Sequence, residues 1–163
     1  MGDFAFLPVE EMRNGEIMLR LRGTCPEDPA RHLVPAYKFD ICLLDGTRVG
    51  VCALRVGHTM RLFFGGNIGY GVDAPYRGHH YAARACLMLF ELARRHGMEY
   101  LYITCAPDNT ASARTCRRTG CQYLCTVPVP EDHDMFLAGK RQVMVWRAEL
   151  RENGSLRTAP DEV

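Results

Sequence analysis

The sequence predicts a mixed α/β domain of the α+β kind. Runs with alternating apolar and polar residues come first along the chain, and two runs with helical periodicity follow among further strands. The chain has 163 residues, 47% of them hydrophobic, which is enough for one buried core. We therefore expect a single domain over residues 1–150 and a polar, mobile tail over residues 151–163.

Seven segments have the alternation or the β-rich composition of strands. They are residues 16–22, 37–44, 48–56, 67–72, 100–105, 122–129 and 142–149. The second and third segments flank Asp45-Gly46, a dipeptide typical of a two-residue β-hairpin turn. The fourth contains two glycines, and glycine within a strand often marks the close approach of a ligand or another backbone.

Two helices are expected in the second half of the chain. The apolar residues of segment 81–96 recur at helical spacing, and the glycine that follows supplies a left-handed stop. Segment 110–119 follows a Pro-Asp-Asn signal for a helix start and ends at another glycine. The Pro-rich segment 25–33 favours a loop with a short helical piece, and the polar segment 130–141 favours a loop.

Composition limits the classes of partner. The formal net charge is only +1, which does not favour nucleic acid or a membrane surface. No apolar run approaches the length that crosses a bilayer, and the N-terminus lacks the basic start and long apolar stretch of a signal peptide. We therefore expect a cytoplasmic protein that binds neither nucleic acid nor a membrane.

The eight cysteines are expected to be reduced thiols. None forms a Cys-x-x-Cys pair, so a zinc-ribbon or redox motif is not favoured, and no metal is expected. Four lie in apolar runs, where a free thiol packs as a small hydrophobic group: Cys42, Cys52, Cys86 and Cys105. The alternative is a Cys/His metal protein with a cluster around Cys116, Cys121 and His133.

The turn before the first helix has the character of a phosphate site. Its sequence is Arg-Gly-His-His-Tyr-Ala over residues 77–82. The unpaired amides of a helix start and the helix dipole favour a phosphate or pyrophosphate there. Gly78 removes a side chain where the ligand approaches, and Arg77 supplies a cation. The alternative is an ordinary strand–helix connection, whereas the Rossmann and P-loop fingerprints are both absent.

With its preceding strand, this turn resembles a known motif. Residues 70–82, Tyr-Gly-Val-Asp-Ala-Pro-Tyr-Arg-Gly-His-His-Tyr-Ala, are similar to the coenzyme A-binding motif [QR]-x-x-G-x-[GA] of the GNAT superfamily of N-acetyltransferases. Asn109-x-x-Ser112, with Gly120 behind it, is similar to the next motif of that family and resembles most the ribosomal-protein alanine N-acetyltransferases. The resemblance covers residues 66–124 well.

The resemblance implies a GNAT-type fold, in which a mostly antiparallel central sheet of six to seven strands is flanked by helices. Strands 66–72 and 100–105 would splay apart and leave a slot between them. It also implies direct transfer of an acetyl group from acetyl-coenzyme A to a primary amine, on a small molecule or a protein N-terminus, without a metal. Edge strands near the C-terminus are compatible with a homodimer.

Site residues follow from the same resemblance. The pantetheine arm would bond to the strand backbone, and the pyrophosphate to amides of the turn. The residues expected to bind acetyl-coenzyme A are Tyr70, Gly71, Val72, Arg77, Gly78, His79, His80, Tyr81, Ala82, Asn109 and Ser112. The candidate catalytic residues are Asn109, Ser112 and Cys116, although Asn109 and Ser112 also suit the cap and first turn of a helix.

Three positions depart from the family pattern. His80 replaces a motif glycine, and binding through its amide requires that the turn does not need a positive φ. Cys116 stands where many members carry a tyrosine acid, and it either protonates the leaving thiolate or packs in the core. Asn67 stands where related enzymes often carry a glutamate, and an amide cannot accept the proton of an ammonium group.

The base must therefore come from elsewhere, or the acceptor must arrive neutral. The candidates are Asp40, Asp73 and the acidic cluster Glu131-Asp132-His133-Asp134. The missing tyrosine and glutamate also leave an alternative from another class, a catalytically inactive module that binds acyl-coenzyme A.

Overall fold

The computed structural model describes residues 4–151 and contains eight strands in two sheets. In chain order the elements are β1 (Glu11–Arg13), β2 (Ile17–Cys25), the 3-10 helix η1 (Pro29–Arg31), β3 (Ala36–Leu43), β4 (Arg48–Arg55), α1 (Met60–Gly65), β5 (Ile68–Val72), the 3-10 helix η2 (Ala74–Tyr76), α2 (Tyr81–Arg95), β6 (Tyr100–Cys105), α3 (Thr110–Arg118), β7 (Gln122–Pro128), α4 (Asp134–Leu137) and β8 (Gln142–Glu149). The domain is α+β, as predicted.

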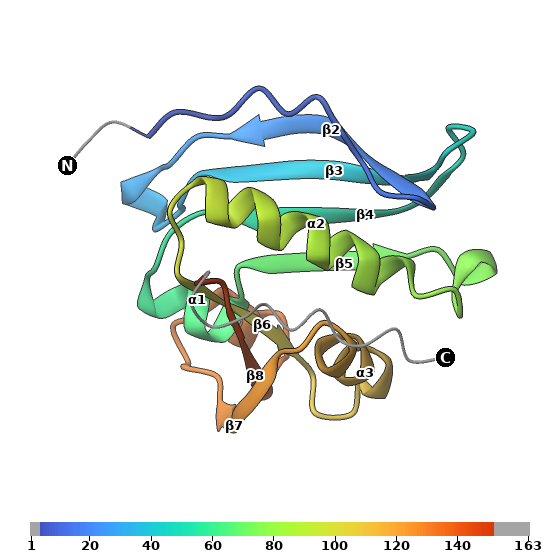
Figure 1. Ribbon diagram of the computed structural model, residues 1–163. Helices are drawn as coiled ribbons and strands as arrows, with labels where there is room; N and C mark the ends of the chain where they lie inside the picture. The colour runs from blue at the N-terminus through green and yellow to red at the C-terminus, as the bar shows by residue number, and fades with distance from the viewer. Residues whose placement is uncertain (1–3, 152–163) are drawn as a thin grey trace.

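The two sheets lie side by side and are joined where β5 and β6 begin (Figure 1). One has the strand order β1-β2-β3-β4-β5 and the other β6-β8-β7, and every neighbouring pair is antiparallel. Helix α2 crosses one face of the larger sheet, and α3 lies beside the smaller one (Figure 1). The expected splay between the fourth and fifth predicted strands is therefore confirmed.

All seven expected strands and both expected helices form, with ends within a few residues of the predicted ones. The structure adds four short elements that the sequence did not predict, β1, α1, η2 and α4. Strand β1 is why the count is eight rather than six to seven. Helix α4 lies within the expected loop 130–141, and the predicted tail lies outside the described residues from residue 152 onward.

The main core lies between the larger sheet and α2. Leu19, Phe39 and Leu54 of the sheet are fully buried in the same cluster as Leu89 and Leu92 of the helix. Burial of one such leucine stabilises the fold by about 1.5–3 kcal/mol. All eight cysteines are free thiols, and the four expected to pack in apolar runs are buried. This core holds α2, and therefore the turn that precedes it, at a defined place on the sheet.

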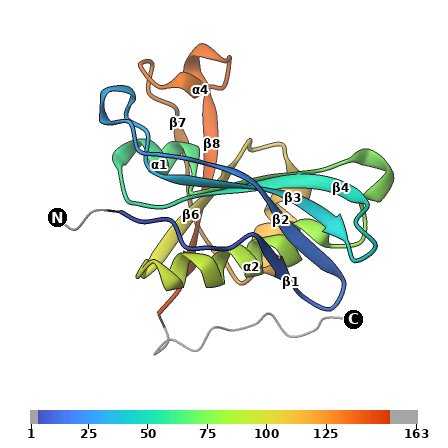
Figure 2. The ribbon, with the colours of Figure 1, turned by 90° about the horizontal axis from the view of Figure 1, so that it is seen from above.

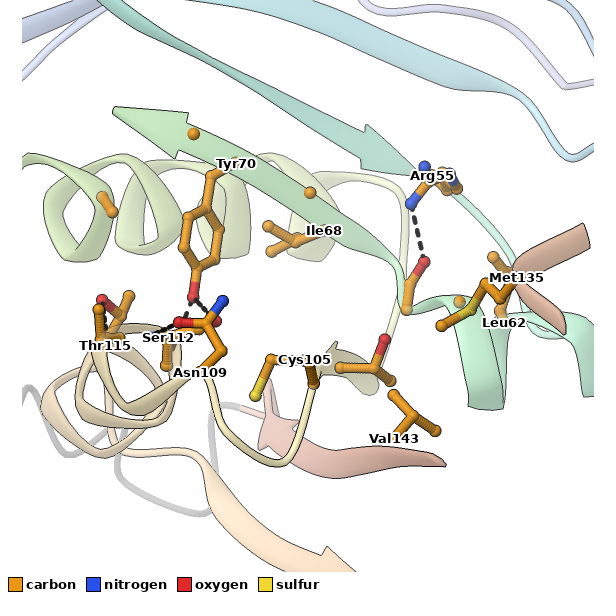
Figure 3. A pocket seen from close by; sticks show the side chains of 18 of the residues that line it. Arg55, Leu62, Ile68, Tyr70, Cys105, Asn109, Ser112, Thr115, Met135 and Val143 are labelled. Carbon is orange, nitrogen blue, oxygen red and sulfur yellow. Dashed lines mark hydrogen bonds between the residues drawn. The ribbon is translucent and has the colours of Figure 1, made fainter. Parts of the chain in front are cut away.

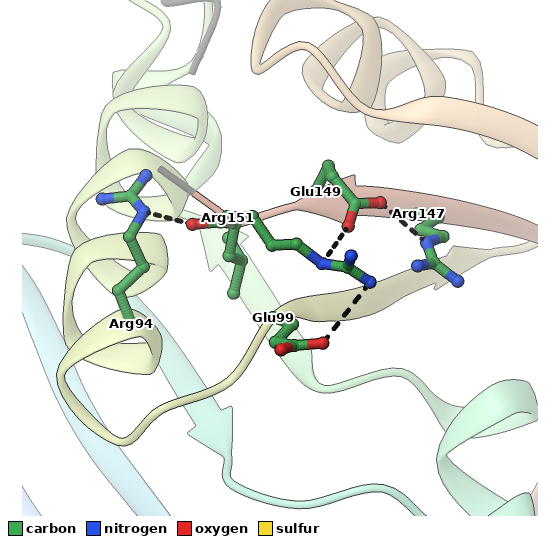
Figure 4. Close-up of polar contacts among 6 residues, drawn as sticks. Arg94, Glu99, Arg147, Glu149 and Arg151 are labelled. Carbon is green, nitrogen blue, oxygen red and sulfur yellow. Dashed lines mark hydrogen bonds and ion pairs between the residues drawn. The ribbon is translucent and has the colours of Figure 1, made fainter. Parts of the chain in front are cut away.

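Polar contacts hold the end of β8 against α2 and the start of β6 (Figure 4). Arg94 Nε on α2 donates to the Leu150 carbonyl at 3.0 Å, and Arg151 pairs with Glu99 at 3.4 Å and with Glu149 at 3.5 Å. These ion pairs are partly exposed, so each contributes less than about 1 kcal/mol. Their effect is chiefly to orient the smaller sheet. No helix in residues 4–151 combines the length and the apolar character needed to cross a membrane.

Candidate active site

A pocket of about 1200 Å³ opens between the two sheets, where β5 and β6 separate. Its two ends are made by different elements (Figure 3). At the turn end it is lined by Tyr70, Ser112 and the turn that precedes α2. At the Arg55 end, where β4 finishes, it is lined by η1, α1, α4 and the start of β8. Figure 2 shows α1 and α4 gathered on the same side of the molecule.

Asn67 joins the two sheets at the point where the pocket begins. The residue is fully buried, its amide nitrogen donates to the Tyr102 carbonyl at 2.7 Å, and its side-chain oxygen accepts from the Tyr102 amide at 2.9 Å. Its side-chain nitrogen donates to the carbonyls of Arg55 and Gly57, each at 2.9 Å. Every hydrogen-bonding group of this side chain is used structurally, so Asn67 positions the strands.

Beyond Asn67, one edge of β5 is open to the pocket. The Asn67 carbonyl accepts from β4 at 2.7 Å, and the Asp73 amide donates to β4 at 2.8 Å. Because the bonding side alternates along an antiparallel strand, Tyr70 and Val72 turn their peptide groups away from β4. No strand of the described chain pairs with this edge. An extended ligand is thus offered backbone donors and acceptors.

The turn at residues 77–82 presents a group of free amides. No amide from Gly78 to Ala83 donates to an acceptor within residues 4–151, and Gly78 has a φ of +91° with open space at the position of a Cβ atom. Arg77 Nε donates to the Val72 carbonyl at 2.9 Å, which fixes the turn against β5. Free amides in such a turn, followed by a helix start, form a concavity that suits anions.

His80 adopts a left-handed conformation, with a φ of +63°. The turn therefore does use a positive φ, the condition on which the sequence left binding through this amide open. A glycine adopts this conformation freely, whereas another residue incurs a cost of about 1–2 kcal/mol. Histidine is among the residue types that tolerate the region best, so the turn adopts this conformation without a glycine at residue 80.

Most of the predicted cofactor-binding residues line one pocket. Tyr70, Gly71, Val72, Arg77, Gly78, His80, Tyr81, Ala82, Asn109 and Ser112 do so. His79 does not, and its ring stacks on Tyr81 with centroids 5.3 Å apart. His79 is therefore placed outside the pocket, because its side chain turns onto its neighbour.

The start of α3 meets β5 through a pair of hydroxyl groups. Asn109 caps the helix, since its side-chain oxygen accepts from the Ser112 amide at 3.0 Å. The Ser112 hydroxyl lies 2.6 Å from the Tyr70 hydroxyl (Figure 3). Burial raises the pKa of Tyr70, so the phenol stays protonated. Sequence reasoning assigned only the backbone of Tyr70 to the site, because a strand pattern does not tell where a ring ends.

Cys116 lies in the core and does not line the pocket. Its sulfur interacts with the Cys121 sulfur, and this contact together with burial raises the pKa of Cys116 far above its usual range. Of its two predicted roles, packing is the one that its position supports. Residues 4–151 contain no cluster of three or more His, Cys, Asp or Glu suited to a metal ion, so Cys116, Cys121 and His133 do not form one.

The geometry leaves few of the acidic residues that were candidates for the general base. Asp40 pairs with Arg48 at 3.0 Å outside the pocket, and Asp73 is also outside it. Of the acidic cluster, only His133 and Asp134 line the pocket. His133 Nδ1 accepts from the Met135 amide and its Nε2 lies 3.1 Å from the Arg61 carbonyl, so both ring nitrogens are engaged. Asp134 is the remaining carboxylate.

Comparisons with known proteins identify the family and agree with the fold. The family model of the acetyltransferase (GNAT) domain matches residues 18–122. No curated protein matches the sequence significantly. Among solved structures, a Vibrio cholerae protein described as a ribosomal-protein-serine acetyltransferase has 17% identity and a TM-score of 0.64, covering 88% of this chain and 99% of its own.

Two further structures show the same fold with ligands. The microcin C7 self-immunity acetyltransferase MccE, in complex with acetyl-coenzyme A and AMP, has 20% identity and a TM-score of 0.55 over 70% of this chain. RimJ of Mycobacterium smegmatis, in complex with coenzyme A disulfide, has 22% identity and a TM-score of 0.55 over 72% of this chain. The present chain spans only 61% of the MccE chain and 54% of the RimJ chain. Because the family model covers well over half of the sequence, the chain belongs to the GNAT acetyltransferases, a family of acyltransferases whose acyl donor is acetyl-coenzyme A.

Proposed function

We propose that this enzyme transfers the acetyl group of acetyl-coenzyme A directly to a primary amine, on a small molecule or a protein N-terminus. The observation that carries the proposal is the single continuous pocket that runs from the turn end, past Tyr70 and Ser112, to the Arg55 end. Both substrates fit into such a pocket at once, with the thioester at its middle. Proximity of two bound reactants is itself a large contribution to catalysis.

At the turn end, the pyrophosphate of the donor binds to the amides of Gly78, His80, Tyr81 and Ala82, and Arg77 adds a positive charge. The pantetheine arm lies along the open edge of β5 and bonds to the backbone of Tyr70 and Val72. Free amides with no competing acceptor support the first assignment, and the unpaired strand edge supports the second. His79 and Cys116 are not part of this proposal.

During transfer, the amine nitrogen forms a bond to the acetyl carbon and the carbon–sulfur bond breaks. We assign the Tyr70 and Ser112 hydroxyls as the donors that stabilise the departing thiolate. The ammonium proton of the acceptor passes to Asp134, the only carboxylate among the described residues that line the pocket, directly or through water.

A covalent acetyl-cysteine is disfavoured. Cys105 lines the middle of the pocket, but burial raises its pKa, and a thiol is a much weaker nucleophile than a thiolate. Steady-state rates measured while both substrates vary should therefore give intersecting double-reciprocal lines, and Cys105→Ser should keep most of the activity. Parallel lines together with an inactive Cys105→Ser variant would contradict direct transfer.

Release of coenzyme A tests the proposal as a whole. Free thiol is followed while acetyl-coenzyme A is incubated with a panel of amines and peptides, and mass spectrometry identifies the acetylated nitrogen. Release with a free α-amino or primary amine group supports the proposal. No release across the panel, with acetyl-coenzyme A still bound, would support the alternative of an inactive binding module.

A further inference from the structure

The charges at the Arg55 end of the pocket are unequal. Among the described residues, five cationic side chains line this end, whereas a single carboxylate, Asp134, does so. The cations are Arg31, Lys38, Arg55, Arg61 and Lys140. They come from five separate stretches of the chain, so the excess is a property of the folded pocket. A ligand that carries negative charge is attracted to such a cavity.

Arg55 is a partly buried member of this group of five cations. Its Nη1 donates to the Gly66 carbonyl at 3.0 Å, which orients the guanidinium at the end of β4 (Figure 3). No ion pair among residues 4–151 involves Arg55. A guanidinium stays charged even when burial lowers its pKa, and a partly buried charge without a counter-ion is costly.

The surrounding strand face leaves room for a ligand. Ala36 lies opposite Arg55, and Lys38 lies opposite Ala53, two positions before Arg55 on the same face of the hairpin. The neighbouring position of β5 is Gly69, whose missing Cβ would meet nothing within 4 Å. Small residues beside two cations form a shallow recess, with the guanidinium at its end.

We propose that the acceptor is an amine that also carries a carboxylate or phosphate group, and that Arg55, with Lys38, binds this anionic group at the Arg55 end. The inference rests on the proposed transfer to an amine and specifies the chemistry of that amine. Arg55 contributes a fork of parallel donors, which matches a carboxylate or phosphate. Lys38 adds a point charge from the neighbouring strand. Asp134, the first residue of α4, is left to face the ammonium group.

The test compares acceptors that differ only in charge. One arm uses three peptides with the same free N-terminal serine, followed by Asp-Asp, Asn-Asn or Lys-Lys. The other arm uses O-phosphoserine, serine and serine amide. We expect kcat/KM for the anionic member to exceed that of its neutral counterpart by about tenfold or more, mostly through KM. A preference confined to the peptides indicates a protein N-terminus, and one confined to the small amines indicates a metabolite.

Arg55→Gln should reduce this preference to about twofold, with the loss of kcat/KM falling mainly on the anionic acceptor. The matched control is Arg48→Gln, at the other end of the same strand and outside the pocket, which should keep the full preference. Equal rates for anionic and neutral acceptors, or a preference that survives Arg55→Gln, would overturn the inference and leave the proposed function standing.

A binding experiment that needs no turnover distinguishes failure of the anion site from failure of the proposed acetyl transfer. The N-acetylated Asp-Asp peptide is titrated calorimetrically into wild-type protein and Arg55→Gln in the presence of coenzyme A. Binding to the wild type that is lost in Arg55→Gln supports the anion site even if no acceptor is acetylated. Identical heats for the two proteins, or weaker binding of acetyl-coenzyme A by Arg55→Gln, would assign Arg55 elsewhere.

Discussion

His80 holds the turn before α2 in a left-handed conformation with a φ of +63°, at the position where the family motif has glycine. We therefore propose that the site uses the shape of the backbone here and that the imidazole does not contact the ligand. The residue type at position 80 therefore does not by itself decide whether the turn can bind a phosphate. A histidine in the motif signals a lost site only if the turn cannot keep its φ.

His80→Gly should keep the affinity for acetyl-coenzyme A within about threefold, because glycine adopts the same φ without strain. His80→Val should weaken binding by about tenfold, since a β-branched residue is excluded from this region. Calorimetric titration measures both. A loss of similar size in His80→Gly would mean that the imidazole itself contacts the ligand.

Tyr70 and Ser112 form one hydrogen-bonded unit at the middle of the pocket. Tyr70→Phe should lower kcat about tenfold to a hundredfold, because a donor to the leaving thiolate is lost, and should change acetyl-coenzyme A binding little. Ser112→Ala should have a similar effect. The kcat of the double variant should be no lower than that of the more impaired single variant. Tyr123→Phe, at a hydroxyl outside the pocket, is the control. Fully additive losses would contradict a shared role.

Asp134 should matter only while the acceptor is protonated. An α-amino group has a pKa of about 8, so at pH 7 most of it needs a base, and above about pH 9 it arrives neutral. Asp134→Asn should therefore lower kcat/KM about tenfold at pH 7, with the defect shrinking as pH rises. The pH profile of both proteins is the measurement. A defect of constant size from pH 6 to 10 would remove Asp134 as the base.

Among the elements, strands of five or more residues and helices of nine or more follow their periodicity, whereas the missed elements have six residues or fewer and are too short to show one. Helix α1 has six residues, α4 four and β1 three. Their ends depend on local caps such as Thr59, whose hydroxyl accepts from the Leu62 amide. Two of these elements, α1 and α4, form the Arg55 end of the pocket, so that end was not predicted.

The turn end was predicted because its signals are local. Gly78 and the Asn109 cap are visible in a window of a few residues. The role of Asn67 was not predicted, since its partners Arg55, Gly57 and Tyr102 come from distant segments. Neither the spacing of residues nor the composition reveals that such distant partners meet in the fold. Sequence reasoning registered only that a glutamate was missing.

Asn67→Ala should destabilise the junction between the sheets. It leaves two carbonyls and one amide in a buried place without their partner, which costs about 1 kcal/mol each and about 3 kcal/mol in all. Urea denaturation should show this loss in the free energy of unfolding. Asn14→Ala removes two comparable bonds at a partly exposed turn and should cost less. An Asn67→Ala protein of wild-type stability would contradict the structural role.

At the scale of the whole molecule, two antiparallel sheets that touch at one end and part at the other create the pocket. The larger sheet and α2 position the turn end, and α3 lies beside the smaller sheet (Figure 1). Met135 and Phe136 of α4 pack against Val143 and Val145 of that sheet. The predicted homodimer stays a prediction. Strand β7 forms an edge of the smaller sheet and exposes Tyr123 and Leu124, so the edge is available to a second copy.

Calorimetric titration of three proteins tests whether the turn at residues 77–82 holds the pyrophosphate of acetyl-coenzyme A. The wild type should bind with a micromolar Kd, and Gly78→Val should bind at least about tenfold more weakly, because valine cannot adopt the φ of +91° that orients the amides. Gly97→Val removes a glycine with a φ of +79° at the far end of α2, outside the pocket, and should bind like the wild type. No binding by the wild type at high micromolar concentration, or equal affinities for wild type and Gly78→Val, would contradict the account.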